Sequence, residues 1–375
     1  SSRRRHTRFR NVTEVQTCAL PISFDAQLST IRIERPEELA GGSATFSARI
    51  APGSVLRNPW GWDRTAVQIH LGWLYVDGST QWWTAFTGYI RRVSTNSDGY
   101  GTNIIQFEAD TLTAWLGEDK WTPDYVRPLS GMTVNAASDI ILGTLGLGTS
   151  YRAWSTLGDW TPSEGVAENP FTLTEPGRSK WETLTDLQGL RGLEVGILQN
   201  GALATVPFGY VSGVAHVYRH EEANSLEQLI QSGGTEIDFQ QRATATYCQG
   251  DGPLGDTITA AIIDTVAEGN LASARFKPRR VPMIESQSGQ VSTGILTLRA
   301  QSIAEQGFPI RVDHRISGLL NLGVARRDRV VIYDAESHGI PDGSHHVILT
   351  QSIQWDLGIH TGDWKAAHTL GLRAL

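Results

Sequence analysis

Two close pairs of carboxylates are the first residues in this sequence whose spacing could support catalysis. Glu108 and Asp110 lie two residues apart, and Glu118 and Asp119 are adjacent. Glycosidases use two carboxyl groups that flank the scissile sugar bond. Spacing along the chain does not place two acids across a sugar, so a glycoside hydrolase is an alternative and not the main interpretation.

A group of acids and histidines near the C-terminus has the residue types that bind metals. Asp334, Glu336 and His338 alternate after a predicted strand, and His345 and His346 follow a turn. At strand ends such residues are more often solvated than bound to a metal. The sequence also lacks G-x-S-x-G, H-E-x-x-H and P-loop motifs. We therefore predict a protein that is not an enzyme, with no catalytic, cofactor-binding or metal-ligating residues and no cofactor.

Three glycines at positions 143, 146 and 148 partly match a dinucleotide-binding pattern. That pattern requires a strand before the glycines and a helix after them. Here they follow a predicted helix, so we interpret them as its C-terminal end.

Tryptophan is unusually frequent, with 12 residues in a chain of 375. Exposed tryptophans on a β-sheet could stack on sugar rings, whereas buried ones fill cores and subunit interfaces. Adjacent residues of a strand point to opposite faces, so either Trp82 or Trp83 must point away from the core. The candidates for a subunit interface or for stacking on a ligand are Trp60, Trp62, Trp73, Trp82 and Trp83.

The first 22 residues are basic and have no hydrophobic period. By residue type they could be an arm that binds phosphate groups or a transit peptide. Back-translated, residues 2–8 and 12–22 resemble the two fixed halves of an Illumina index adapter, with residues 9–11 at the variable index. We interpret residues 1–22 as translated adapter sequence, exclude them from the fold and expect them to be disordered.

Exclusion of residues 1–22 changes the charge and the cysteine count. The formal net charge moves from −7 to −11, and Cys248 is the one cysteine left. An acidic chain gives no general reason to expect nucleic-acid binding, and a single cysteine cannot form an internal disulfide. No stretch approaches the ~18 consecutive apolar residues of a membrane span, so none is predicted.

Alternation of apolar and polar residues predicts a β-rich domain over residues 23–128. Ile31 and Ile33 alternate with charged residues, and the stretch SATFSARI at 43–50 repeats this period. Asp-Gly pairs at 77–78 and 98–99 mark two hairpin tips. Five or six mostly antiparallel strands of this length are expected to close into a small barrel or sandwich.

Residues 129–206 change to helical periodicity and are predicted to form a smaller α+β domain. Apolar residues at helical spacing predict a helix from about 134 to 145. Ser179 and Glu182 form a capping box that opens a second helix. The pair Asn200-Gly201 predicts a hairpin after this helix.

Residues 207–375 return to strands and are predicted to form a second β-barrel with an inserted helix near 292–306. Strand-like segments occur at 308–315, 329–335, 345–357 and 364–373. The chain is therefore predicted to be mainly β with an α+β insertion. Two small tube-like β-barrels would be joined by a helix-plus-hairpin domain.

The order of these segments resembles that of one family. An N-terminal barrel with GSATFSARI is followed by Phe86, Gly88 and Ile90 in an F-x-G-x-I pattern. The strand-to-helix stretch IIQFEADTLTAWL comes next, and then W-E-T-L-T-D-L-x-x-x-x-G-L-E-V at 181–195 before the Asn-Gly hairpin. Over most of residues 23–375 the chain resembles the tail-hub, or baseplate-hub, family of minor tail proteins of tailed bacteriophages.

The resemblance implies a structural protein of the virion, assembled in the cytoplasm of the bacterial host. Two tube-like barrels per chain would let a homotrimer imitate the six-fold tail tube and close its distal end. The implied partners are other tail proteins, such as the distal tail ring and the tip or spike, with DNA only in passage through the channel. A carbohydrate- or receptor-binding β module is the alternative beside the glycoside hydrolase.

Overall fold

The computed structural model describes the chain in segments. Residues 1–22 lie outside the described residues. Their interpretation as adapter sequence and their expected disorder therefore remain predictions. In the described part of the chain, no helix has both the length and the apolar character that crossing a membrane requires. The described residues are 27–36, 41–50, 65–74, 79–97, 103–122, 132–156, 176–189, 191–198, 200–207, 210–220, 228–238, 245–251, 256–263, 282–290, 293–307, 311–318, 321, 323–357 and 364–374.

Five antiparallel strands form the N-terminal half of the main sheet, in the order β1-β2-β5-β4-β3. Alternate residues of these strands are buried in one core, in which Phe46 stacks on Phe107 with ring centroids 4.9 Å apart. Paired strands flank both Asp-Gly pairs, as the sequence predicts. The strands are β1 (Gln27–Arg35), β2 (Ser43–Ile50), β3 (Ala66–Leu74), β4 (Thr80–Ser97) and β5 (Asn103–Asp110).

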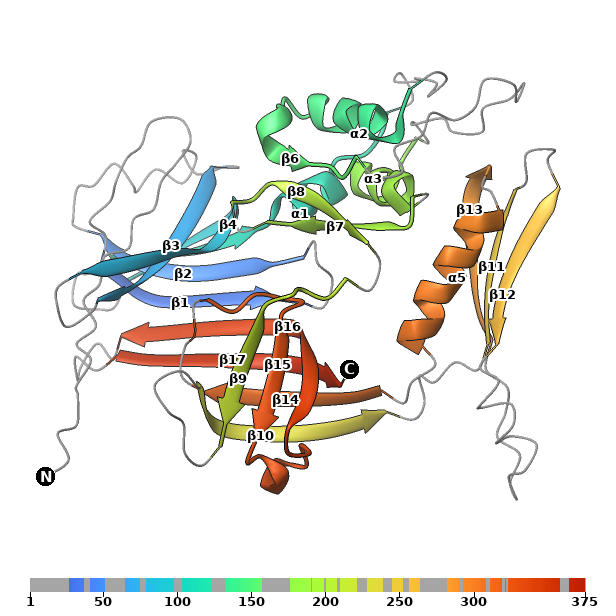
Figure 1. The fold of residues 1–375 in the computed structure, drawn as a ribbon. Coiled ribbons are helices and arrows are strands. Elements are labelled where there is room, and N and C mark those ends of the chain that lie inside the picture. The colour runs from blue at the N-terminus through green and yellow to red at the C-terminus, as the bar shows by residue number, and fades with distance from the viewer. Residues whose placement is uncertain are drawn as a thin grey trace, which may run out of the picture.

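Six further strands pair in a closed circuit below this half (Figure 1). Because β15 pairs with both β9 and β16, the order β15-β9-β10-β14-β17-β16 returns to its start. Their inward residues form a second core, to which Ala335 and Ile340 around the short 3-10 helix η4 (Glu336–His338) contribute. The strands are β9 (Ala215–Arg219), β10 (Gln228–Asp238), β14 (Arg311–Gly318), β15 (Arg329–Tyr333), β16 (Ser344–Leu357) and β17 (Trp364–Ala374).

The two halves are joined in one sheet of 11 described strands. The reason is the length of β16: its first residues pair with β15, and residues 351–356 pair with β1. Among the described strands β3 ends the sheet, so the N-terminal half does not close on itself. The prediction of a mainly β fold is confirmed.

A smaller α+β layer lies above the N-terminal strands in the view of Figure 1. The capping box is formed as predicted, with Glu182 N–H donating to the Ser179 hydroxyl at 3.1 Å and Ser179 N–H donating to the Glu182 carboxylate at 3.0 Å. Gly146 follows a helix with φ of 72°, in agreement with the interpretation of the glycines as a helix end. The elements are α1 (Leu112–Glu118), α2 (Val134–Gly143), η3 (Thr149–Tyr151), β6 (Arg152–Ala153), α3 (Lys180–Gly189), β7 (Leu193–Ile197) and β8 (Leu203–Pro207).

The segment between β10 and β14 forms a unit of its own. Helix α5 (Thr293–Gly307) is present where a helix was predicted, and it packs on β11 (Ala245–Asp251) and β12 (Thr257–Ile263). With β13 (Pro282–Gln290), these strands make a three-stranded sheet in the order β12-β11-β13. In Figure 1 this unit lies beside the six-stranded circuit and not within it. Strands β12 and β13 were not predicted.

Candidate functional site: an arginine-lined pocket

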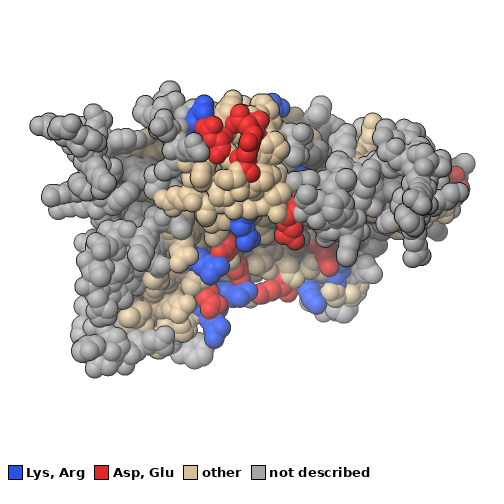
Figure 2. Space-filling view, turned by 90° about the horizontal axis from the view of Figure 1, so that it is seen from below, with Lys and Arg blue, Asp and Glu red and all other residues tan. Residues whose placement is uncertain are grey.

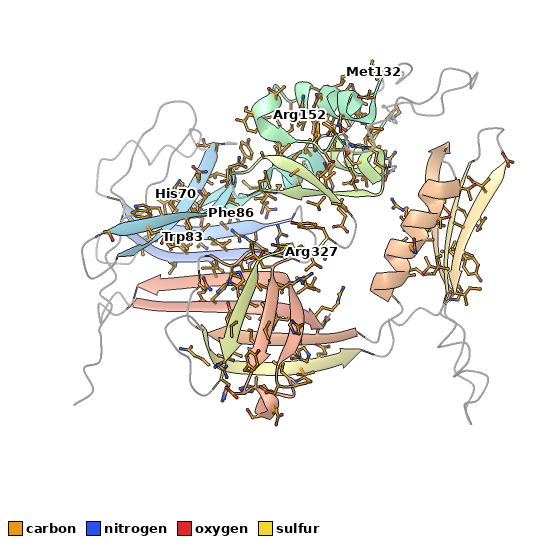
Figure 3. The ribbon with its side chains drawn as sticks, in the orientation of Figure 1. His70, Trp83, Phe86, Met132, Arg152 and Arg327 are labelled. Carbon is orange, nitrogen blue, oxygen red and sulfur yellow. The ribbon has the colours of Figure 1, made fainter. Side chains whose placement is uncertain are left out.

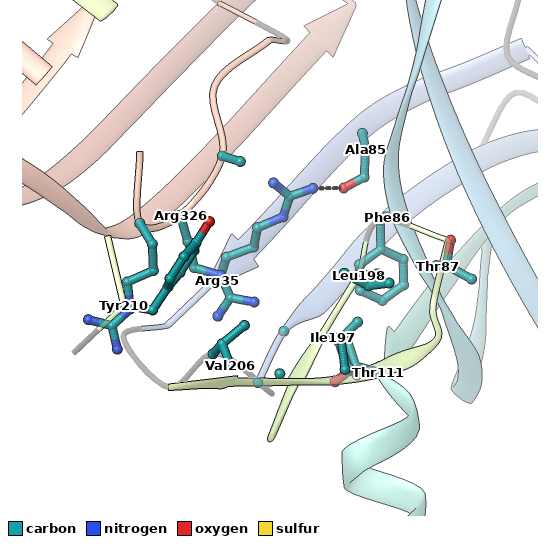
Figure 4. Close-up of a pocket in the computed structure, with 16 residues that line it drawn as sticks. Arg35, Ala85, Phe86, Thr87, Thr111, Ile197, Leu198, Val206, Tyr210 and Arg326 are labelled. Atoms are coloured by element: carbon teal, nitrogen blue, oxygen red, sulfur yellow. Dashed lines mark hydrogen bonds between the residues drawn. The ribbon is translucent and has the colours of Figure 1, made fainter. Parts of the chain in front are cut away.

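A pocket of about 220 Å³ lies where three parts of the chain meet (Figure 4). The N-terminal strands, the β7–β8 hairpin and the loop before β15 each supply part of its wall. In Figure 4, Arg35, Arg326 and Tyr210 lie on one side, and Phe86, Ile197 and Leu198 lie on the other. The fold therefore builds this site from residues far apart in the sequence.

Arg35, the last residue of β1, lines the pocket with its guanidinium group. Nη1 donates to Oε1 of Gln351 at 2.5 Å, and Nη2 donates to the carbonyl oxygen of Ala85. Both acceptors are neutral, and Arg35 has no carboxylate partner among the described residues. Burial lowers the pKa of Arg35 to about 10, so the group keeps its charge at neutral pH at a cost in lost hydration.

Two further arginines reach the pocket from the loop before β15. Arg326 donates through Nη1 to the carbonyl oxygen of Pro36 at 2.9 Å. Burial, together with repulsion from Arg35 and Arg327, lowers the pKa of Arg326 to about 10. Arg327 forms an ion pair with Glu194 of β7 at 3.3 Å. Three guanidinium groups therefore line one pocket.

The backbone of Arg327 is left-handed, with φ of 70°. This conformation is uncommon for a residue other than glycine and costs about 1–3 kcal/mol. Two hydrogen bonds of 2.7 Å hold it: Arg327 N–H donates to the Ile348 carbonyl oxygen, and Ser212 N–H donates to the Arg327 carbonyl oxygen. Arg327 Nε is buried and has no hydrogen-bond partner in the described part of the chain. A strained residue with an unused donor thus lies in the pocket wall.

The other walls are apolar. Phe86 is buried in the N-terminal core, and Ile197 and Val206 face the pocket from the hairpin. Leu198 and Tyr210 also line the pocket, and their exposed fractions are 43% and 44%. The pocket therefore combines cationic groups with an apolar surface that continues outside it.

The β7–β8 turn, predicted from Asn200-Gly201, sits close to the N-terminal sheet. Gly201 has φ of 84°, and a Cβ at this position would come within 2.5 Å of Thr87 Cγ2 on β4. Ala202 N–H donates to the Asn200 side-chain oxygen at 3.0 Å, which stabilises the turn. A glycine at this position thus lets the hairpin approach the sheet and close one side of the pocket.

Trp82 and Trp83 lie on opposite faces of β4. Trp83 packs against the N-terminal core (Figure 3), whereas Trp82 is 40% exposed. The Trp82 ring lies over Gly72 of the paired strand β3, where a Cβ would approach it within 2.7 Å. Trp60, Trp62 and the side chain of Trp73 lie outside the described residues. An interface or stacking role for any of these five tryptophans remains a prediction.

The carboxylates that suggested a hydrolase form ion pairs. Arg91 contacts Asp110 at 2.8 Å and Glu108 at 3.9 Å, and Lys180 contacts Asp119 at 2.6 Å. Burial raises the pKa of Asp110, and the charge of Arg91 opposes this shift. These contacts give the acids a structural role and give no support to a carboxylate pair across a cleft.

The acids and histidines around the β15–β16 connection are divided among separate contacts. Asp334 pairs with Arg219 at 3.0 Å, and the His346 ring packs edge-on against His314 inside the circuit, with centroids 4.8 Å apart. Among the described residues, no three His, Cys, Asp or Glu side chains are grouped so that they could hold a metal ion. Viewed from the end of the molecule that carries η4, the described acidic and basic side chains are interspersed on the surface (Figure 2).

Sequence analysis did not predict the arginine pocket. Arg326 and Pro36, which meet there, are 290 positions apart in the chain. The adjacent pair Arg326-Arg327 before an apolar strand is the one local signal, and it is equally typical of a solvated strand entry.

Comparison with solved structures identifies the fold. A tail protein from Neisseria meningitidis MC58 matches with a TM-score of 0.62 at 15% identity, covering 96% of this chain and 95% of that one. The 43 kDa tail protein of prophage MuSo2 from Shewanella oneidensis matches with a TM-score of 0.61 at 14% identity, covering 96% and 97%. This chain therefore has the fold of prophage tail proteins.

A component of the Escherichia coli type VI secretion system also matches, with a TM-score of 0.57 at 7% identity over 96% of this chain and 77% of that one. That protein is described as structurally similar to the bacteriophage T4 tail proteins gp27 and gp5. No protein-family model matches the sequence, and no curated protein matches it. The similarity is therefore carried by the fold and not by sequence identity.

Proposed function

We propose that this chain is a structural component of a bacteriophage tail, a hub protein that closes the distal end of the tail tube and connects it to the baseplate or tip. The observation that carries the proposal is the extent of the match: 96% of this chain aligns with tail proteins over 95% and 97% of their own length. A match of this extent includes the main sheet and its insertions. In this role the protein acts in the virion and is not a catalyst.

The main sheet supports assembly into a ring. The N-terminal half and the six-stranded circuit put two β units into each chain, so a homotrimer would arrange six units around an axis. β3 ends the sheet among the described strands, and an end strand offers backbone N–H and C=O groups to a neighbour. Trp82, exposed on the strand paired with β3, is assigned to this subunit contact.

The other proposed partners follow from the ring. Its two ends would contact further tail proteins, one set toward the tube and one toward the tip. DNA would pass through the channel without being bound, since an acidic chain does not attract the phosphate backbone.

Light scattering coupled to size-exclusion chromatography tests the proposal on a protein that begins at Ser23. We expect a concentration-dependent trimer, and rings in negative-stain electron microscopy. Trp82→Ser is expected to weaken the trimer at unchanged thermal stability, whereas Ile284→Ser, at a residue 62% exposed on the inserted sheet, is the control and should leave it intact. A compact species that stays monomeric at the highest concentration contradicts the proposal.

A further inference from the structure

The ring described above makes no use of the inserted sheet formed by β11, β12 and β13. We propose that the face of this sheet opposite α5 binds an amphipathic helix of another protein through the apolar stripe of that helix. The inference stands on the inserted sheet alone and holds whether or not the chain forms a tail hub.

Helix α5 covers one face of the inserted sheet. Cys248 of β11 and Ala260 of β12 are buried in the same cluster as Leu296 of α5. Glu285 of β13 points to the same side, since its carboxylate accepts a hydrogen bond from Nε of Arg299 on α5 at 2.8 Å. In Figure 1, α5 lies on the side of the sheet that is turned toward the rest of the molecule. The opposite face is therefore turned away from the other parts of the fold.

The strand register defines which residues form this opposite face. Neighbouring residues of a strand point to opposite sides, so the residues of β11 that alternate with Cys248 point away from α5. Pairing adds their partners on β12 and β13. The face consists of three cross-strand rows without a charged residue: Ile263, Ala245 and Pro282; Ala261, Tyr247 and Ile284; and Thr259, Gln249 and Ser286.

The first two rows are apolar, and they are exposed on both edge strands. Ile263 of β12 is 44% exposed and Ile284 of β13 is 62% exposed, and Ala261 beside them is exposed as well. Among the described residues, seven large apolar side chains are exposed, and three of the seven belong to this sheet. Isoleucine is usually buried, and exposed apolar patches mark interaction sites. The composition of this face therefore calls for a second covering layer.

The size of the face favours a single element over a second copy of the chain. Three strands about 4.8 Å apart, with about seven residues of about 3.3 Å each, cover roughly 300 Å². A stable interface between two folded proteins buries about 800 Å² on each side. One α-helix is about 10 Å across with its side chains, and α5 already covers the other face of this sheet as a single helix.

The arrangement of the apolar rows favours a helix over an added strand. Successive rows lie about 6.6 Å apart along a strand, close to the 5.4 Å pitch of a helix, so leucines on consecutive turns can meet both rows. A helix lying along β11 covers Ile263 on one side and Ile284 on the other. A strand added at one edge of the sheet would leave the isoleucine of the other edge in water. An apolar helix stripe, with its polar side in solvent, fits this face.

Fluorescence anisotropy with the full chain tests the proposal. The probe is a labelled peptide of about 18 residues, long enough to form a helix, made of alanine, lysine, glutamate and leucine. Its leucines occupy positions i, i+3, i+4 and i+7 and form one stripe. A second peptide has the same composition with the leucines spread around the helix, and a third is a short peptide of alternating threonine and valine that can add to a sheet edge. We expect the stripe peptide to bind at least about tenfold more tightly than either of the others.

Four variants locate the binding. Ile284→Ser and Ile263→Ser are each expected to weaken binding of the stripe peptide about tenfold. Ala261→Lys keeps both isoleucines and puts a charge between the apolar rows, so it is expected to abolish binding. The matched control is Met283→Ser: this neighbour of Ile284 is 49% exposed, but it lies on the same face as Glu285 and should bind the peptide as the unmodified chain does.

Several outcomes overturn the proposal. These are equal binding of the stripe peptide and the rearranged peptide, no binding of either, and unchanged binding in the folded Ile284→Ser and Ala261→Lys variants. Binding of the threonine–valine peptide as tight as that of the stripe peptide identifies a sheet edge as the site. A lower oligomer mass of Ile284→Ser in light scattering shows that a second copy of the chain covers the face, and also overturns the assignment to a helix of another protein.

Discussion

At the scale of single residues, Gly88 shows why the F-x-G-x-I pattern contains glycine. The Phe86 ring folds back over position 88, so a Cβ there would lie within 2.6 Å of the ring atom Cζ and would also collide with the Asp110 backbone oxygen. Phe86 and Ile90 are both buried in the N-terminal core. Glycine is therefore needed for close packing, and not for an unusual backbone angle.

Replacement of Gly88 by alanine is expected to destabilise the fold by about 3 kcal/mol, since a methyl group forces backbone and ring apart in a packed core. Urea unfolding followed by circular dichroism measures this change. Gly117→Ala in α1 is the control: a Cβ there meets nothing within 4 Å, and alanine favours a helix by up to about 1 kcal/mol. Equal stability of the two variants would contradict this account of the pattern.

His346 makes the stability of the circuit depend on pH. Its side chain is buried, its Nε2 lies 2.7 Å from the Ser344 hydroxyl oxygen, and its ring packs on His314. Burial, and repulsion from His314 and His345, lower the pKa of His346 from 6.5 to about 4. Burial, with repulsion from Arg35, also lowers the pKa of His368 to about 4. Both histidines are therefore neutral in the folded protein at pH 6.

Between pH 6.5 and pH 4 the unfolded chain binds more protons than the folded one, so the free energy of unfolding falls as the pH is lowered through this window. We expect His346→Phe to reduce this pH dependence, because phenylalanine fills the site without titrating. Urea titrations at several pH values measure the slope. Ile348→Val, in the same core, is the control: it should cost about 1 kcal/mol at every pH and leave the slope unchanged. An unaltered slope in His346→Phe would exclude this role.

At the scale of elements, the capping box at the start of α3 is local chemistry that the sequence predicts in full. Both reciprocal hydrogen bonds between Ser179 and Glu182 are formed. The bond that the Ser179 backbone N–H donates to the Glu182 carboxylate is the largest cause that lowers the pKa of Glu182. Trp121 packs against this helix, and its indole N–H donates to the Thr183 hydroxyl at 3.0 Å. The cap thus fixes where α3 begins and which residues meet the α+β core.

Ser179→Ala is expected to lower the free energy of unfolding by about 1 kcal/mol, because the Glu182 N–H loses its acceptor. Thermal and urea unfolding both measure the loss. Ser179→Asp keeps an acceptor at the N-cap and should restore most of the stability. If the alanine and aspartate variants behave alike, the side-chain cap does not stabilise this helix.

The strands show which elements alternation predicts and which it does not. β1 to β5 bury one face, so their residues alternate and were predicted. In β12, Ile258 and Ile262 lie toward the core, but Ala261 and Ile263 are exposed, so the alternation of polar and apolar residues stops after the first four positions. β13 is too polar to suggest a strand. Both strands are defined by the pairing with β11 and not by their own pattern.

At the scale of the whole molecule, the features that sequence reasoning missed are contacts between distant segments. The pairing of β1 with β16 joins residues such as Ile33 and Ile353, and no local pattern encodes that register. The same pairing brings Gln351 to Arg35 at the pocket. The pairing of β1 with β16 therefore produces both the continuous sheet and one wall of the arginine pocket. Sequence periodicity does not reveal this pairing.

The position of the inserted unit leads to a prediction about the whole chain. β10 and β14 pair antiparallel, with Asp238 opposite Arg311, so residues 239–310 leave and re-enter the sheet at one end of this pair. A two-residue Asn-Gly turn can join strands that pair in this way. We expect a chain in which Asn-Gly replaces residues 239–310 to fold cooperatively and to retain the oligomeric state of the full chain.

Some loss of stability is expected, since Leu296 of α5 belongs to the same buried cluster as Leu187 of α3. Circular dichroism melting and light scattering measure the two outcomes. The matched control joins Ile237 to Arg311 through the same turn, which shifts the register by one residue and would turn the buried face of β10 outward. We expect that control to be insoluble or to melt without cooperativity. If the in-register deletion behaves in the same way, the inserted unit is part of the folding core and not an addition to it.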